Sequence, residues 1–187
     1  MRVARSRILR NAAGSAGILV AVVALALGLP ALDRALPAER VVAAGPYEVG
    51  AGVTVVPPPG AVVDVTNTRP GADRGAALFL VGAVRYVIVV TPFTGDLESA
   101  AERLRRKITG VRGSQVAGAE SATTTLSGLP GLQGGYTAPG RGGRYAVFRA
   151  PDLAIEVTVA GNVADLRRAL AGVDASTRSI AFRERDA

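Results

Sequence analysis

The sequence predicts an α+β domain in which two helices pack on an antiparallel sheet, preceded by one N-terminal transmembrane helix. Three observations predict this architecture. An apolar run without a charge occupies residues 12–32. Short runs of β-branched residues separated by Gly and Pro follow it, which is typical of strands. Two later stretches space their apolar residues at the period of an amphipathic helix.

The N-terminal segment has the pattern of a membrane anchor. Residues 1–11 carry four arginines and no acidic residue, and residues 12–32 contain 21 uncharged positions. At a rise of about 1.5 Å per residue, this run spans roughly 30 Å, the thickness of a bilayer's hydrocarbon core. The positive-inside rule makes residues 1–11 a cytoplasmic tail and places everything after the span outside. We therefore expect a single-pass protein of the cell membrane with an extracytoplasmic C-terminal domain.

A cleaved signal peptide is the alternative interpretation of this segment. The apolar run is longer than the usual core of about 7–15 residues, and Leu36-Pro37-Ala38 matches the cleavage pattern poorly. We expect a stalk at residues 33–45, the folded domain at 46–183 and a charged tail at 184–187. Small residues recur every four positions at Ala13, Gly17 and Ala21, a spacing that allows membrane helices to pair, although an Ala-rich span also shows it by chance.

The first half of the domain begins with strands. A β-branched run at residues 53–56 ends at the proline turn of residues 57–60, because proline cannot continue a strand. Residues 67–75 have the composition of an exposed loop. Residues 76–81 and 85–91 form a predicted hairpin around Gly82, and the second of these strands is apolar enough to be central.

Two helices are expected, each with its own N-cap. Asp96 caps the first helix, and Asn162, with Asp165 three residues later, caps the second. The apolar stripes are Leu97, Ala100, Ala101, Leu104 and Ile108 in the first helix, and Val163, Leu166, Leu170 and Val173 in the second. The basic residues of the first helix are Arg103, Arg105, Arg106 and Lys107. We expect them to form its solvated side, with a docking face as the alternative.

Several strands lie between the helices. Predicted pieces occupy residues 114–117, 122–126, 134–138, 145–149 and 153–160, and a last apolar piece occupies 180–182. The strand at 153–160 alternates, which predicts that Glu156 and Thr158 lie on an exposed face.

Three short segments resemble the PsbP/Mog1-like α/β fold, in particular the small membrane-anchored exported domains of actinobacteria. They are residues 47–60 (YEVGAGVTVVPPPG), 125–132 (TLSGLPGL) and 176–182 (STRSIAF). The resemblance implies an antiparallel sheet sandwiched by helices. It also implies a binding or accessory role with diverse partners, without a defined substrate or site residue.

Composition excludes several kinds of chemistry. The chain has no cysteine and no histidine, so disulfides, Cys nucleophiles and Ser-His-Asp triads are excluded, and we expect no metal site and no cofactor. Of the formal net charge of +7, the four N-terminal arginines Arg2, Arg5, Arg7 and Arg10 supply +4, which leaves +3 for the rest. Nucleic-acid binding needs a dense basic surface, so we expect none.

A glycine-rich stretch at residues 134–143 (GGYTAPGRGG) is the most notable candidate site. It lacks the spacing and the lysine of a phosphate-binding loop, and its Pro139-Gly140 and Gly142-Gly143 pairs indicate a hairpin loop. The residues that offer a site for an anionic ligand or lipid headgroup are Arg141, Arg144, Tyr136 and Tyr145. Solvated arginines beside a turn are the alternative.

No catalytic group is assigned. Thr123, Thr124, Thr125 and Ser127 offer hydroxyls without a base near them in sequence, and a Ser-Lys dyad would need Lys107, on the exposed side of its helix. Asp64, Asp73 and Asp152 lie in predicted turns, where aspartate is common. The sequence therefore gives no reason to join any two of these acids.

These observations predict a non-enzymatic, membrane-tethered module that binds an envelope protein partner or serves as an accessory subunit. The first alternative is a domain that binds an envelope lipid or glycan, and the second is a hydrolase that works without histidine. An apolar cavity would favour the lipid or glycan, and a filled core with an exposed apolar patch would favour the protein partner. Converging acids of perturbed pKa would favour the hydrolase.

Overall fold

The computed structural model describes residues 39–42 and 45–184. The predicted cytoplasmic tail and anchor, residues 1–32, lie outside these ranges, as do residues 33–38 of the predicted stalk and 185–187 of the charged tail. Within the described ranges, no helix combines the length and apolar character needed to span a bilayer.

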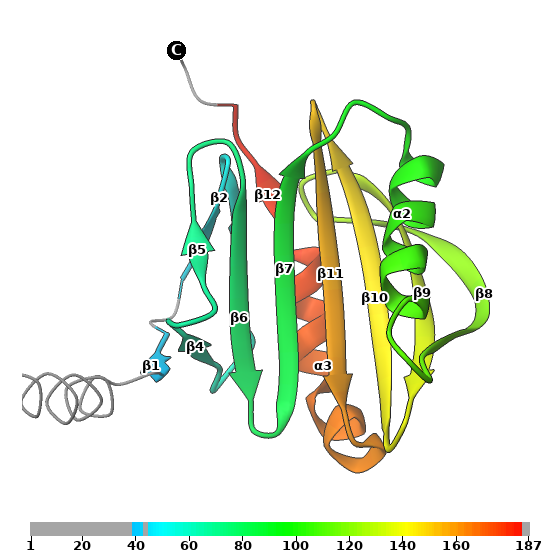
Figure 1. Cartoon of the computed structure of the whole chain (residues 1–187). Helices are drawn as coiled ribbons and strands as arrows, with labels where there is room; N and C mark the ends of the chain where they lie inside the picture. Colours follow the sequence, from blue (N-terminus) through cyan, green and yellow to red (C-terminus); the bar gives the residue numbers. More distant parts are fainter. Residues whose placement is uncertain (1–38, 43–44, 185–187) are drawn as a thin grey trace, which may run out of the picture. The chain divides into compact units, whose positions relative to one another are not determined.

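A large antiparallel sheet forms the centre of the domain (Figure 1). Its strands are, in spatial order, β1 (Glu39–Val41), β4 (Val62–Asp64), β6 (Gly75–Val81), β7 (Val84–Pro92), β11 (Leu153–Gly161), β10 (Arg141–Ala150), β9 (Pro130–Ala138) and β8 (Gln115–Thr124), with β5 (Arg69–Pro70) also paired to β6. The predicted hairpin around Gly82 is β6 and β7, and β7 is a central strand as expected.

A second, smaller sheet contains β2 (Tyr47–Gly50), β3 (Val53–Val55) and β12 (Ala181–Phe182), in the order β12-β3-β2. The C-terminal strand therefore joins the early β2–β3 hairpin, because β12 pairs with β3. Ser127 Oγ donates a hydrogen bond to the Ile180 carbonyl at 2.9 Å, which ties the TLSGLPGL turn to this C-terminal strand.

Two helices cover opposite faces of the large sheet. α2 (Leu97–Thr109) packs on β8, β9 and β10, and α3 (Val163–Arg178) packs on β7, β10 and β11. Figure 1 shows α2 on the near face and α3 behind the sheet. The predicted caps are confirmed: an oxygen of Asp96 accepts from the Ser99 amide at 2.8 Å, and Asn162 Oδ1 accepts from the Asp165 amide at 2.9 Å.

Alternating residues of the strands divide between two apolar clusters. Phe148 and Ile155 belong to the larger cluster, which includes Val173 of α3 and the valines of the small sheet. Val147 and Ala154 belong to the second cluster, which lies under α2. Because strand side chains alternate between faces, each helix has its own core.

The structure confirms an antiparallel α+β fold with two helices and adds strands that the sequence pattern did not indicate. The large sheet begins at Glu39, inside the range expected as a stalk, because residues 39–41 pair with β4. The expected loop at 67–75 contains β5. The pieces expected at 114–117 and 122–126 form one strand, β8, whose register shifts between Ala117 and Ser121.

Candidate binding groove beneath α2

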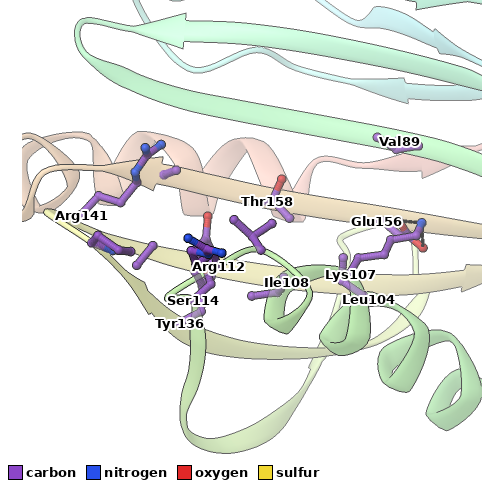
Figure 2. A pocket seen from close by; sticks show the side chains of 14 residues that line it. Val89, Leu104, Lys107, Ile108, Arg112, Ser114, Tyr136, Arg141, Glu156 and Thr158 are labelled. Atoms are coloured by element: carbon purple, nitrogen blue, oxygen red, sulfur yellow. Dashed lines mark hydrogen bonds and ion pairs between the residues drawn. The ribbon is translucent and has the colours of Figure 1, made fainter.

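A groove of about 550 Å³ lies between α2 and the sheet face beneath it. Its lining is predominantly apolar, with side chains from α2 and from strands β7 and β11. The apolar side chains that line it include Val89, Leu104, Ile108, Val111 and Ala160. Figure 2 shows these elements around the groove. The helical spacing of Leu104 and Ile108 places them on one side, with Val111 in the turn that follows α2. The strand period places Thr158 and Ala160 on the other side.

A buried carboxylate forms part of the groove wall. Glu156 is 4% exposed, although the alternation of its strand predicted an exposed position. That prediction was wrong because α2 covers this face of the sheet. Arg103 Nη2 lies 2.9 Å from Glu156 Oε1, and Lys107 Nζ lies 2.6 Å from Oε2. These two cations neutralise the carboxylate, so Glu156 presents no unpaired negative charge to the groove.

The basic residues of α2 are therefore not only a solvated face. Arg103 also donates to Thr91 Oγ1 at 2.9 Å, and its guanidinium lies 4.5 Å from the centroid of the Phe93 ring. Arg105 pairs with Glu102 on the helix and with Glu120 on β8. Arg103, Arg105 and Lys107 bind α2 to the sheet, whereas Arg106 pairs with Glu102 of its own helix.

The glycine-rich stretch forms part of a hairpin, and only Pro139-Gly140 makes its turn. Gly142 and Gly143 lie within β10, contrary to the expected turn. Gly143 pairs with Tyr136 across the strands, and a Cβ on Gly143 would overlap the Tyr136 ring. The ring crosses β10 at this point, and Tyr136 Oη donates to the Val159 carbonyl on β11 at 3.1 Å. The glycine thus makes room for a tyrosine that lines the groove.

Two arginine side chains at the groove form no ion pair within the described residues. Arg112, which follows α2, and Arg141, at the start of β10, both line the groove and are exposed. Neither guanidinium forms an ion pair or hydrogen bond with another described side chain. Ser114 and Thr158 add hydroxyl groups to the same lining. The groove therefore combines apolar walls with unpaired cations and hydroxyl groups.

The four residues considered together as an anion site are separated by the sheet. Arg144 lies on the α3 side, where its Nη1 is 3.1 Å from Asp174 Oδ2. Tyr145 is 1% exposed, and its hydroxyl donates to Glu120 Oε1 at 2.7 Å. Burial, and next the Glu120 carboxylate, raise the pKa of Tyr145 to about 12. Only Arg141 and Tyr136 remain at the groove.

Arg112 was missed by the sequence analysis. It follows α2 by three positions, and nothing local distinguishes it from other turn arginines. Its place at the groove depends on the way the turn after α2 packs against the β9–β10 hairpin, and that contact is not visible in the sequence pattern.

Two of the hydroxyl groups considered for catalysis, those of Thr125 and Ser127, have structural partners. Thr125 Oγ1 accepts from the Leu129 amide at 3.0 Å and lies 2.9 Å from Ser127 Oγ. These bonds hold the turn between β8 and β9. Lys107 donates its hydrogen bonds to the Glu156 carboxylate, and no bond joins it to either hydroxyl within the described residues.

The three aspartates lie in separate turns. Asp64 accepts from the Thr66 and Asn67 amides, Asp73 pairs with its neighbour Arg74, and Asp152 lies between β10 and β11. The hydrogen bond from Asn67 lowers the pKa of Asp64, as expected for an acid that orders a turn. Within the described ranges, no group of three or more acidic side chains could hold a metal ion.

Comparison with solved structures identifies the fold. The solution structure of cyanobacterial PsbP (CyanoP) from Synechocystis sp. PCC 6803 matches with a TM-score of 0.53 and 13% sequence identity, over 76% of this chain and 95% of that one. The chain has the PsbP/Mog1-like fold. A second PsbP/Mog1-like structure, LpqN of Mycobacterium tuberculosis, described as involved in cell envelope biogenesis, matches with a TM-score of 0.48 and 15% identity, over 78% of this chain and 91% of that one. No family model and no curated protein matches the sequence.

Proposed function

We propose that this chain is a non-enzymatic extracytoplasmic module of the cell envelope, tethered through residues 12–32, that holds the apolar part of an envelope lipid in the groove beneath α2. The single observation that carries this proposal is the groove itself, with its volume of about 550 Å³ and its predominantly apolar lining. Its volume lies within the range of roughly 300–1,000 Å³ typical of small-molecule sites.

The two faces of the sheet support a site under α2. On the α3 side, Tyr86, Ile88, Phe148 and Ile155 are at most 1% exposed, so that face is filled by the protein's own side chains. On the α2 side, Val89 and Ala160 remain only partly covered. Exposed apolar surface inside a groove is stabilised when an apolar ligand removes it from water.

The polar groups of the groove support binding over catalysis. Glu156 is the acid in its lining, and two cations already neutralise it, so it is a poor general base. The hydroxyls of Ser114 and Thr158 therefore lack an activating partner among the groove residues. Both can still donate hydrogen bonds to a bound molecule.

The test fills the groove and measures bound lipid. Full-length protein is purified from membranes of its own host, and the co-purifying lipids are extracted and quantified by mass spectrometry. We expect one lipid class to be retained by the wild type and lost from Ala160→Phe, whose ring would occupy the groove. Ala164→Phe is the matched control, because Ala164 is exposed on α3. Equal lipid recovery from Ala160→Phe and the control, with both variants folded, would contradict the proposal.

A protein partner is the second candidate function, and a different surface favours it. Leu126 is 82% exposed and Val56 is 43% exposed. The Leu126 amide donates to the Arg178 carbonyl at 2.7 Å, and the Val56 amide donates to Ser179 Oγ at 2.9 Å. Both apolar side chains therefore flank the C-terminal end of α3, away from the groove.

Affinity purification of the tagged full-length chain tests this second function. A membrane protein recovered in near-equal amount from the wild type and lost from Leu126→Ser would support it. Val163→Ser is the control, since Val163 is 62% exposed at the opposite end of α3. Loss of the partner from both variants, or from neither, would count against docking at Leu126.

A further inference from the structure

We propose that the groove selects amphiphiles with an anionic headgroup, and that Arg112 and Arg141 together hold this headgroup. The inference rests on the proposed function, because it names the chemistry of the ligand that the same groove binds. It assigns the ligand two parts, an apolar chain against the walls of the groove and a carboxylate or phosphate at one end.

The fold brings the two arginines to the same end of the groove. The turn after α2 packs on the turn of the β9–β10 hairpin so closely that a Cβ on Gly113 would lie 2.7 Å from Pro139 Cγ. Arg112 precedes Gly113, and Arg141 follows Pro139 by two residues. In Figure 2, both arginines lie toward one end of the groove, and the Lys107–Glu156 ion pair lies toward the other.

The acids that pack α2 onto the sheet are already bonded elsewhere. Glu156 pairs with Arg103 and Lys107, and Glu120 is bonded to Arg105 and Tyr145. Among the charged residues that line the groove, Lys107 balances Glu156, so Arg112 and Arg141 leave an excess of positive charge. The groove therefore favours a negative ligand by charge complementarity.

The chemistry of the free groups matches a carboxylate or phosphate. A guanidinium presents several donors in a planar fork that fits both oxyanions. The hydroxyls of Ser114 and Thr158 can donate to oxygens that the arginines leave unbonded. A neutral headgroup gains no net electrostatic attraction from the two guanidinium groups, whereas an anionic headgroup does.

The remainder of the groove fits the apolar chain. Leu104, Ile108 and Val89 line the part that extends from the arginines toward Glu156. Because Glu156 is neutralised and almost buried, the apolar chain meets a surface of low net charge there. Polar and apolar groups are thus separated along the groove, as they are along an amphiphile.

The chain has no cysteine, so a single introduced cysteine provides a unique reporter. Val111 lines the groove and is 60% exposed, which makes Val111→Cys accessible to an environment-sensitive fluorophore. The labelled full-length protein is placed in nanodiscs of neutral phosphatidylcholine. It is then titrated with dodecanoate, dodecyl phosphate, dodecanol and inorganic phosphate, so that headgroup charge varies while the alkyl chain stays the same.

We expect dodecanoate or dodecyl phosphate to bind about tenfold more tightly than dodecanol, a difference of about 1.4 kcal/mol. The Arg112→Gln, Arg141→Gln double variant should abolish this preference while dodecanol binding stays unchanged. Arg167→Gln is the matched control, because Arg167 is exposed on α3. The ratio between the two anionic probes shows whether a carboxylate or a phosphate is preferred.

Three outcomes would overturn the inference. Equal binding of the anionic probes and dodecanol, all lost in Ala160→Phe, would reject the headgroup site and leave the lipid groove standing. Binding of inorganic phosphate as tightly as dodecyl phosphate would indicate an anion site to which the alkyl chain of the ligand contributes nothing. Failure of every probe to change the fluorescence would reject the groove function together with the inference.

Discussion

Three aromatic rings in β9 and β10 each lie against a glycine directly across the strand pair. Tyr136 faces Gly143, Tyr145 faces Gly134 and Phe148 faces Gly131. In each pair a Cβ on the glycine would overlap the ring. The ring covers the backbone that the glycine leaves bare, a recognised way of stabilising glycine within a sheet. The glycine-rich composition of this hairpin therefore serves packing and does not form a phosphate loop.

The Gly143→Ala substitution tests this packing at the groove. The added methyl group would displace the Tyr136 ring, so we expect the free energy of unfolding to fall by about 1–3 kcal/mol. Gly135→Ala is the control in the same strand pair, since its nearest contact would be 3.4 Å away. Chemical denaturation followed by circular dichroism measures both. If Gly143→Ala lowered the free energy of unfolding no more than Gly135→Ala does, the packing of Tyr136 on Gly143 would not be important for stability.

Two buried tyrosines predict a loss of stability at high pH. Burial is the main cause that raises the pKa of Tyr86 and of Tyr145 to about 12, above the ordinary value of 10.0. Between these pH values the unfolded chain has released the protons and the folded chain still holds them. Stability is therefore retained below pH 10 and falls as the pH rises toward 12, by roughly 2–3 kcal/mol for each tyrosine.

Unfolding measured in urea between pH 9 and about 12 checks this prediction, since that window runs from below the ordinary tyrosine pKa up to the raised pKa of the folded state. Tyr145→Phe removes one titrating group, so its stability should decline less steeply above pH 10 than that of the wild type. Tyr47→Phe serves as a comparison, because Tyr47 is only half-buried. An identical decline in Tyr145→Phe and the wild type would show that the Tyr145 hydroxyl does not contribute.

At the scale of elements, Glu156 is the main polar attachment of α2 to the sheet. Truncating a nearly buried acid leaves Arg103 and Lys107 without their partner, so Glu156→Ala should lower the free energy of unfolding by about 3 kcal/mol. Lys107→Ala should cost at most about 1 kcal/mol, because Lys107 is 52% exposed and Arg103 still neutralises the acid. Denaturant titration of the two variants measures this asymmetry, and equal losses would refute it.

The helices and the strongest strands could be predicted from the sequence because their signals are local. Asp96 and Asn162 cap the helices, and the apolar run of β7 indicates a central strand. Each of these signals depends on residues that lie close together in the sequence. The resemblance carried by the TLSGLPGL turn was informative for the same reason, since Thr125 and Ser127 hold that turn through short-range bonds.

The groove and the remaining strands depend on contacts between distant segments. β1 forms because residues 39–41 meet β4, and β5 forms because Arg69 and Pro70 meet β6. The position of Glu156 could not be read from the alternation of its strand, since that alternation does not show which face a helix covers. Arg112 likewise becomes a groove residue only through the packing of Gly113 on Pro139.

At the scale of the molecule, the sheet divides the described domain into a structural side and the side on which we propose that a ligand binds. The small sheet and α3 fill one face with large apolar side chains, which supplies most of the core. On the other face, α2 is held by ion pairs and a smaller apolar cluster, and the groove remains open beside it. Ligand binding can therefore alter the α2 side without disturbing the main core.

The proposed extracytoplasmic position leads to a labelling prediction for the whole chain. Single cysteines at Val111 and Ser6 report on the folded domain and on the N-terminal tail, because the natural chain has no cysteine. A membrane-impermeant maleimide added to intact cells should label Val111→Cys fully, since this position is 60% exposed. Ser6→Cys should react only after the membrane is permeabilised, as the positive-inside rule requires.

The same samples distinguish an anchor from a cleaved signal peptide. An anchored chain retains Ser6→Cys in the membrane fraction at the mass of the full sequence, whereas cleavage removes this cysteine and releases a shorter chain that still carries Val111→Cys. Protection of Val111→Cys in intact cells would place the groove in the cytoplasm and contradict the envelope lipid as its ligand. The same cysteine reports both ligand binding in nanodiscs and the side of the membrane on which the groove lies. The proposed ligand is therefore a lipid that is present on the side where Val111→Cys is labelled.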